Sequence, residues 1–118
     1  MQTLILQKPG ELTVADTPAP GAPGPGEVRV RVHASGVCGT DRAILNGGFP
    51  GTSWPVTPGH EIAGRVVAAG SEVRHVQVGS RVTSHFYLTC GQCQHCRSGR
   101  ETLCLSSPGQ VGQAIDGG

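Results

Sequence analysis

The most regular feature of the chain is an alternation of apolar and polar residues over positions 27–34. Val28, Val30, Val32 and Ala34 fall at every second position, and two arginines and a histidine stand between them. Because successive side chains of a strand point to opposite faces, this period of two predicts a β-strand with one apolar and one charged face.

Shorter apolar stretches predict further strands. Residues 3–6 and 12–15 are separated by a Lys-Pro-Gly turn and are expected to form a hairpin. A second long strand is expected over 62–69. Residues 76–83 predict a short strand pair around a tight turn at Gly79.

The segments between these strands carry weaker patterns. The Pro- and Gly-rich stretch 18–26 predicts an extended connection, since proline has no N–H to donate and fixes its own φ. A short helix is expected over 40–45, ended by Asn-Gly-Gly at 46–48. Beyond Thr89 the chain shows no periodicity and is organised around cysteines. The pattern as a whole predicts a mainly β fold with short helices.

Composition narrows the class of protein. With 118 residues the chain is expected to form a single domain, and 19 glycines, 9 prolines and 14% charged residues suit a turn-rich β structure. A formal net charge of +1 gives no electrostatic reason to expect nucleic acid or a membrane as partner. The apolar run near the N-terminus is too short for a signal peptide or a membrane span, so a cytoplasmic, reducing setting is expected.

Four of the five cysteines form a compact motif. Their spacing is C-x2-C-x2-C-x7-C, and the members are Cys90, Cys93, Cys96 and Cys104. Zn²⁺ takes four thiolates at tetrahedral positions, and a C-x2-C turn places two sulfurs on one side of such a centre. Because four sulfurs leave no position for water, the motif predicts a structural zinc in a loop over 90–104.

Disulfides, an iron–sulfur cluster and unpaired buried thiols are the alternatives for this loop. A reducing compartment disfavours disulfides, and an odd number of cysteines cannot pair completely within the chain. Ferredoxin-type runs have a different spacing and a proline after the last cysteine. His95 lies inside the loop, but with four sulfurs on the metal it is expected to be a solvated loop residue.

A second group of possible ligands is spread along the chain. Cys38 precedes the expected short helix, and His60 and Glu61 follow a Pro-Gly turn before a strand. Cysteine, histidine and a carboxylate with water in the fourth position would make an open, catalytic zinc site, and Asp41 could hold the outer nitrogen of His60. From the residues alone, a small buried thiol and an ordinary histidine remain an equally supported reading.

Three motifs in order resemble the zinc-dependent medium-chain dehydrogenase/reductase family, which contains alcohol and polyol dehydrogenases. They are Gly-Val-Cys-Gly-Thr-Asp at 36–41, Pro-Gly-His-Glu at 58–61, and the cysteine loop. The resemblance implies a catalytic domain with a GroES-like, partly open β-barrel fold. It also implies a second, Rossmann domain that binds NAD or NADP.

The resemblance assigns roles to single residues. It makes Cys38 and His60 the first two ligands of a catalytic zinc, and Glu61 a nearby, alternative or direct ligand. It makes Thr40 the hydroxyl that binds the substrate alcohol and starts a proton relay, and it places Phe86 on the wall of the substrate pocket. The implied reaction interconverts alcohols with aldehydes or ketones, and the implied full-length enzyme is a homodimer or homotetramer.

The sequence also departs from the family pattern. No G-x-G-x-x-G follows a strand, so the Rossmann domain is absent from residues 1–118, and the remaining zinc ligand is expected outside them. Ala43 stands where some members carry a relay histidine. The chain is therefore expected to be the N-terminal part of the catalytic domain, incomplete relative to the family domain and unable to turn over alone.

Two alternatives from other classes stay open at this point. One is a free-standing zinc-binding module without enzymatic activity, in which the cysteine loop mediates protein contacts. The other is a GroES-like domain without metal chemistry, which the five cysteines disfavour.

Overall fold

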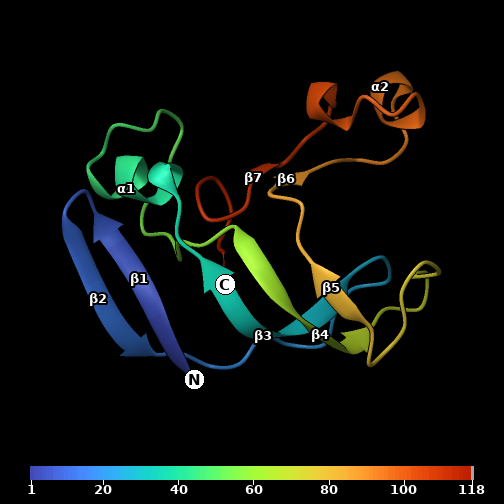
Figure 1. Cartoon of the computed structure of the whole chain (residues 1–118), viewed down its shortest axis with the longest axis horizontal. Coiled ribbons are helices and arrows are strands. Elements are labelled where there is room, and N and C mark those ends of the chain that lie inside the picture. Colours follow the sequence, from blue (N-terminus) through green and yellow to red (C-terminus); the bar gives the residue numbers. More distant parts are fainter. Residues whose placement is uncertain (118) are drawn as a thin grey trace.

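The computed structural model describes residues 1–117 and is built mainly from strands (Figure 1). The N-terminal hairpin pairs β1 (Gln2–Lys8) antiparallel with β2 (Glu11–Asp16), which confirms the expected hairpin. Gly10 in its turn has φ 77°, a conformation that glycine adopts without a Cβ clash.

The central sheet has three antiparallel strands in the order β3 (Val28–Gly36), β4 (Glu61–Ala69) and β5 (Arg81–Thr83). Val30 lies opposite Val66, which is 1% exposed. Three arginines lie directly opposite one another along the other face of the sheet: Arg31, Arg65 and Arg81. The predicted division into an apolar and a charged face is therefore confirmed, although register shifts after Arg29 and after Val32 interrupt the regular alternation.

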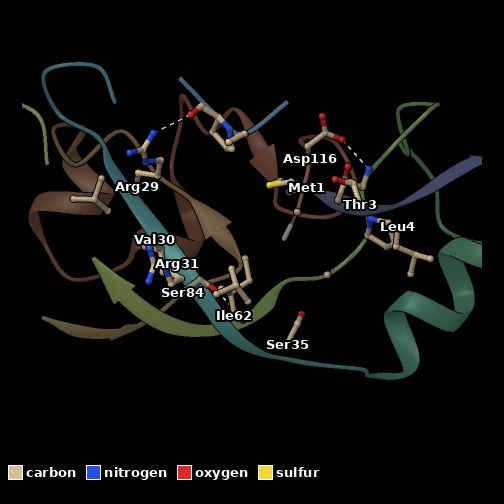
Figure 2. Close-up of a pocket in the computed structure, with 18 of the residues that line it drawn as sticks. Met1, Thr3, Leu4, Arg29, Val30, Arg31, Ser35, Ile62, Ser84 and Asp116 are labelled. Atoms are coloured by element: carbon tan, nitrogen blue, oxygen red, sulfur yellow. Dashed lines mark hydrogen bonds between the residues drawn. The ribbon is translucent and has the colours of Figure 1, made fainter. Parts of the chain in front are cut away.

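This sheet lines an open hollow, at which Arg29 and Arg31 stand as well as the valines of β3 (Figure 2). The hollow measures about 1740 Å³ and lies between the N-terminal hairpin, β3 and the start of β4. Val28 and Val32 remain 36% and 42% exposed on it. Within residues 1–117 the sheets do not close into a barrel, which agrees with the expected partly open form.

The remaining elements are short. α1 (Gly39–Leu45) forms where a helix was predicted and ends at Asn46. The C-terminal part contains β6 (Tyr87–Leu88), α2 (Gln94–Arg97), the 3-10 turn η1 (Glu101–Leu103) and β7 (Gly109–Gln110), with β6 paired to β7. Figure 1 shows α2 and η1 together in a lobe that projects away from the sheets.

The expected strand pair over 76–83 is wrong in its first half. Only β5 forms there, and it pairs with β4 rather than with residues 76–78. The reason lies at Val66, whose N–H donates to the Ser80 carbonyl (3.0 Å) and whose carbonyl accepts from the Gly79 N–H (2.9 Å). The turn is thereby tied to β4, and the backbone groups that a local hairpin would use are already engaged.

The best-buried cluster of side chains lies between β1, α1 and the loop after α1, and not in the central sheet. Leu6, Ile44 and Val56 are at most 2% exposed and pack together. Leu6 and Val56 also exchange two backbone hydrogen bonds of 2.9 and 3.1 Å, so the loop after α1 is fixed to β1 close to His60. Among the described residues, no helix is long and apolar enough to cross a membrane.

Candidate metal centres

The four loop cysteines converge on one point of the projecting lobe. Their sulfurs lie within 4.8 Å of one another. Sγ of Cys96 is 3.5 Å from that of Cys93 and 4.0 Å from that of Cys90. Four thiolates on a tetrahedral zinc are separated by about 3.8 Å, so the observed spacings bracket the value that the metal requires.

The local backbone already favours thiolate at part of this cluster. The Cys93 N–H points at the Cys90 sulfur (3.3 Å), and the Cys90 N–H points at the Cys104 sulfur (3.3 Å). Hydrogen bonds from the backbone N–H of Cys96 and then of Leu105 lower the pKa of the Cys93 thiol from 9.0 to about 6. The N–H of Cys90 likewise lowers the pKa of the Cys104 thiol.

Cys96 differs from its neighbours because it lies at the inside of the cluster. It is the most buried of the four, and burial is the main cause that raises the pKa of its thiol to about 12. A cation at the centre would stabilise the thiolate that burial disfavours. All five cysteines have free thiols. A tetrathiolate zinc site therefore fits the donor set, its spacing and its hydrogen bonds.

His95 corrects one expectation about this lobe. It was expected to be a solvated loop residue, but its ring is half-buried and its Nδ1 is buried without a hydrogen-bond partner. The residue is not one of the four converging donors. It lies within the short α2, next to the buried Cys96.

A second cluster brings together Cys38, Asp41 and His60. The Cys38 sulfur lies 3.0 Å from His60 Nε2, and His60 Nδ1 lies 3.3 Å from Asp41 Oδ1. This arrangement places Asp41 at the outer nitrogen of the ring, as the chemistry of the residues suggested. A proton held on Nδ1 by this carboxylate leaves the Nε2 lone pair free for a metal.

The start of α1 builds half of this cluster. Cys38 is the N-cap of the helix, and its sulfur accepts a hydrogen bond from the Thr40 N–H (3.2 Å). Asp41 closes the capping box because its Oδ2 accepts from the Cys38 N–H (2.9 Å). One carboxylate therefore fixes the backbone of the cysteine and faces the ring of the histidine.

His60 provides the other half from the entrance of β4. It is 6% exposed, and its carbonyl accepts a hydrogen bond from the Ser84 hydroxyl (3.0 Å). Ser84 also accepts from the Ile62 N–H (3.2 Å) and so holds the backbone that follows the histidine. Sequence reasoning missed Ser84, because a serine in a loop carries no signal of a contact 24 positions away.

The other predicted site residues lie around this cluster with different orientations. Thr40 is half-buried in the first turn of α1. The ring of Phe86 stands edge-on to that of His60 with centroids 6.3 Å apart. Glu61 is exposed and its carboxylate lies over Gly36, so it does not join Cys38 and His60.

The donor set fits an open metal site. Asp41 Oδ1 and His60 Nδ1 are buried, and neither has a well-formed hydrogen bond. Their 3.3 Å contact would strengthen when a metal binds at Nε2. Sulfur and nitrogen ligands on tetrahedral zinc are about 3.6 Å apart, somewhat more than the 3.0 Å between Cys38 and His60.

Comparison with known proteins shows the family and the fold of the chain. Residues 24–118 match the family described as the alcohol dehydrogenase GroES-like domain. An alcohol dehydrogenase from Moraxella sp. (strain TAE123) is 40% identical over 122 residues, which cover 99% of this chain and 35% of the relative.

Two solved structures of enzymes share the fold. One is an alcohol dehydrogenase from Escherichia coli CFT073 complexed with NADH, at TM-score 0.85 and 35% identity, covering 100% of this chain and 34% of that one. The other is a cobalt- and zinc-bound thermostable alcohol dehydrogenase from Pyrobaculum aerophilum, at TM-score 0.82 and 35% identity, covering 100% and 36%.

The chain thus spans about a third of the length of the relatives it matches. It belongs to the alcohol dehydrogenase GroES-like domain family, among the zinc-dependent medium-chain dehydrogenases. The expected GroES-like fold class is confirmed.

Proposed function

We propose that this member of the GroES-like alcohol dehydrogenase family is the N-terminal, metal-binding part of a zinc-dependent alcohol or polyol dehydrogenase. The whole enzyme would interconvert alcohols with aldehydes or ketones, using NAD or NADP. The observation that supports this function most is the contact series Cys38–His60–Asp41, with distances of 3.0 and 3.3 Å, beside the ring of Phe86.

Each residue of this cluster has a separate task in the proposed reaction. A zinc ion held by Cys38 Sγ and His60 Nε2 would polarise the alcohol oxygen and favour loss of its proton. Asp41 keeps the imidazole oriented and its outer proton in place. The Thr40 hydroxyl takes the substrate proton while it releases its own toward solvent, so that it relays the proton, and Phe86 limits the space for the carbon skeleton. Glu61 stays a predicted alternative ligand that would have to rotate away from Gly36.

The cysteine loop is proposed to hold a structural zinc through Cys90, Cys93, Cys96 and Cys104. Support comes from sulfur spacings close to those of a tetrahedral site and from backbone N–H groups that favour thiolate. With four thiolates on the metal, the site has no position for a substrate. It therefore contributes to folding and not to the reaction.

The rest of the proposal concerns parts outside this chain. Residues 1–118 would be the N-terminal part of the catalytic domain, and a Rossmann domain elsewhere in the protein would bind the nucleotide. The substrate is proposed to be a small alcohol or carbonyl compound. A cytoplasmic location and a homodimeric or homotetrameric full-length enzyme stay predictions.

Metal content and turnover, measured on two proteins, test this function. The 118-residue chain purified without chelator should carry about one zinc and oxidise no alcohol, because only the cysteine loop has a complete ligand set. The full-length protein should carry about two and reduce NAD or NADP with an alcohol present. Iron in either protein, metal-free oxidised cysteines, or turnover by the isolated chain would contradict the proposal.

A further inference from the structure

The loop over 46–60 that delivers His60 contains no helix or regular strand of its own. It connects α1 to β4 and forms one backbone bridge with β1, between Val56 and Leu6. Such a long irregular connection has many accessible conformations unless other parts of the chain restrain it. The segment 112–117, which follows β7, packs against this loop on the side of His60.

Asp116 and Gly117 form hydrogen bonds with the loop at Thr57, three residues before His60. The Thr57 N–H donates to Asp116 Oδ1 (2.7 Å), and the Thr57 carbonyl accepts from the Gly117 N–H (2.7 Å). Figure 2 shows the first of these bonds at the labelled Asp116. Both backbone groups of Thr57 are therefore held by a segment 59 positions away in the sequence.

Gln113 forms hydrogen bonds with an earlier part of the same loop, at Pro50 and Ser53. Its side-chain Nε2 donates to the Pro50 carbonyl (2.9 Å), and its own carbonyl accepts from the Ser53 N–H (3.1 Å). Gln113 is 7% exposed, and His60 is the other buried polar side chain among the described residues. A buried amide is stabilised by hydrogen bonding, and here the Pro50 carbonyl of the loop accepts from the Nε2 of Gln113.

Backbone contact at Gly59 completes this packing directly beside His60. Gly59 has φ 106°, and the chain passes it at Gly112 and Gly117. A Cβ on Gly112 would lie 2.7 Å from the Gly59 carbonyl oxygen, and a Cβ on Gly117 would overlap the same oxygen. The two segments can approach this closely because neither carries a side chain there.

We propose that Gln113 and Asp116 are positioning residues, which hold the 46–60 loop so that His60 meets Cys38 with its Nε2. This inference rests on the proposed function, because it takes Cys38 and His60 as the zinc ligands. The imidazole is set from the side chain by Asp41 and from its own carbonyl by Ser84. The segment 112–117 sets the three residues that lead into it. Without this restraint the loop would lose conformational entropy when the metal binds, and this cost would lower the affinity for the metal.

The test is a Zn²⁺ titration of the full-length protein, followed through the ring nitrogens of His60 by NMR. Asp116→Ala should weaken zinc binding at His60 about 10- to 100-fold, the range found when groups that orient a ligand are removed. It should also speed hydrogen exchange at the Thr57 amide. Asp116→Asn keeps an oxygen acceptor and should retain most of the parent affinity. Gln113→Leu should weaken binding in the same direction.

Glu72→Ala is the matched control, because it removes one exposed carboxylate from a residue whose backbone N–H bonds Pro25 and not the loop. It should bind zinc at His60 like the parent, and the cysteine loop of every variant should keep its zinc. If Asp116→Ala and Gln113→Leu bind zinc like the parent, the positioning role is wrong. If Asp116→Ala and Asp116→Asn lose affinity equally, the hydrogen bond to Thr57 is not the cause. If the parent itself shows no zinc shift at His60, the proposed function fails instead.

Discussion

The cysteine lobe and the Cys38–His60 cluster assemble their donors in different ways. The lobe takes four sulfurs from one continuous segment, whose first and last ligands are 14 positions apart. The other cluster joins a helix N-cap to the entrance of a strand 22 positions later, and it needs further contacts from Ser84 and the segment 112–117 to hold the histidine.

This difference separates what a metal does in each place. In the lobe the short α2 and η1 have little buried apolar surface, so a zinc bound by the four cysteines would be the main source of order there. At Cys38 and His60 the surrounding helix, strand and loops are ordered by their own hydrogen bonds. A metal can therefore leave this second site without removing the structure around it.

The strongest test makes the same substitution in each region. Cys93→Ala should remove the zinc of the lobe and unfold the 90–104 loop, since zinc binding in such loops contributes on the order of 10 kcal/mol. The expected signs are a lost zinc equivalent, fast hydrogen exchange over the lobe and lower solubility. If Cys93→Ala melts like the parent and keeps its zinc, the lobe does not depend on the metal.

Cys38→Ala is the counterpart in the second region. It should abolish turnover of the full-length enzyme, because the proposed catalytic zinc loses a ligand. The fold should lose the N-cap hydrogen bond from Thr40 and the contact with His60 Nε2, a change of about 1 kcal/mol in the free energy of unfolding. Activity assays and thermal melts on the same preparation check both parts. A collapsed Cys38→Ala protein would mean that the two sites have exchanged roles.

Thr40→Ala tests whether the Cys38–His60 cluster takes part in proton transfer as well as in metal binding. The zinc should stay in place, while hydride transfer in a single turnover should slow about 100-fold as the alcohol loses its proton acceptor. Thr40→Ser keeps a hydroxyl and should restore most of the rate. Equal rates for the alanine variant and the parent would remove Thr40 from the proposed proton path.

The contrast between donors from one continuous segment and donors from distant segments also explains which features the sequence could predict. The cysteine lobe, the N-terminal hairpin and β3 follow from residues close together in the chain, so spacing and periodicity were sufficient. Pairing Cys38 with His60 needed a family resemblance, since periodicity says nothing about which loops meet. The contacts of Ser84 and Gln113 could not be predicted at all. They join distant segments largely through backbone atoms, which any residue carries.

The smallest expected effect concerns the local hydrogen bonds of the lobe and whether they persist when the metal is removed. In the chelator-treated chain at pH 7, Cys93 should be alkylated by iodoacetamide several-fold faster than Cys96. A thiol with a pKa of about 6 is then about nine-tenths thiolate, whereas the buried Cys96 thiol, with a pKa of about 12, stays protonated.

Because the pKa of Cys93 lies below its ordinary value of 9.0, its thiolate contributes fully to stability above pH 9, and that contribution disappears as the pH falls through about 6. The preference for Cys93 should fade over the same fall, which peptide mass mapping at several pH values would follow. The largest of the N–H contacts responsible, from Cys96, lies within one C-x2-C turn, so it can outlast the metal. Equal alkylation of Cys93 and Cys96 at pH 7 would show that these N–H contacts are lost with the metal. The metal alone would then give the lobe its geometry.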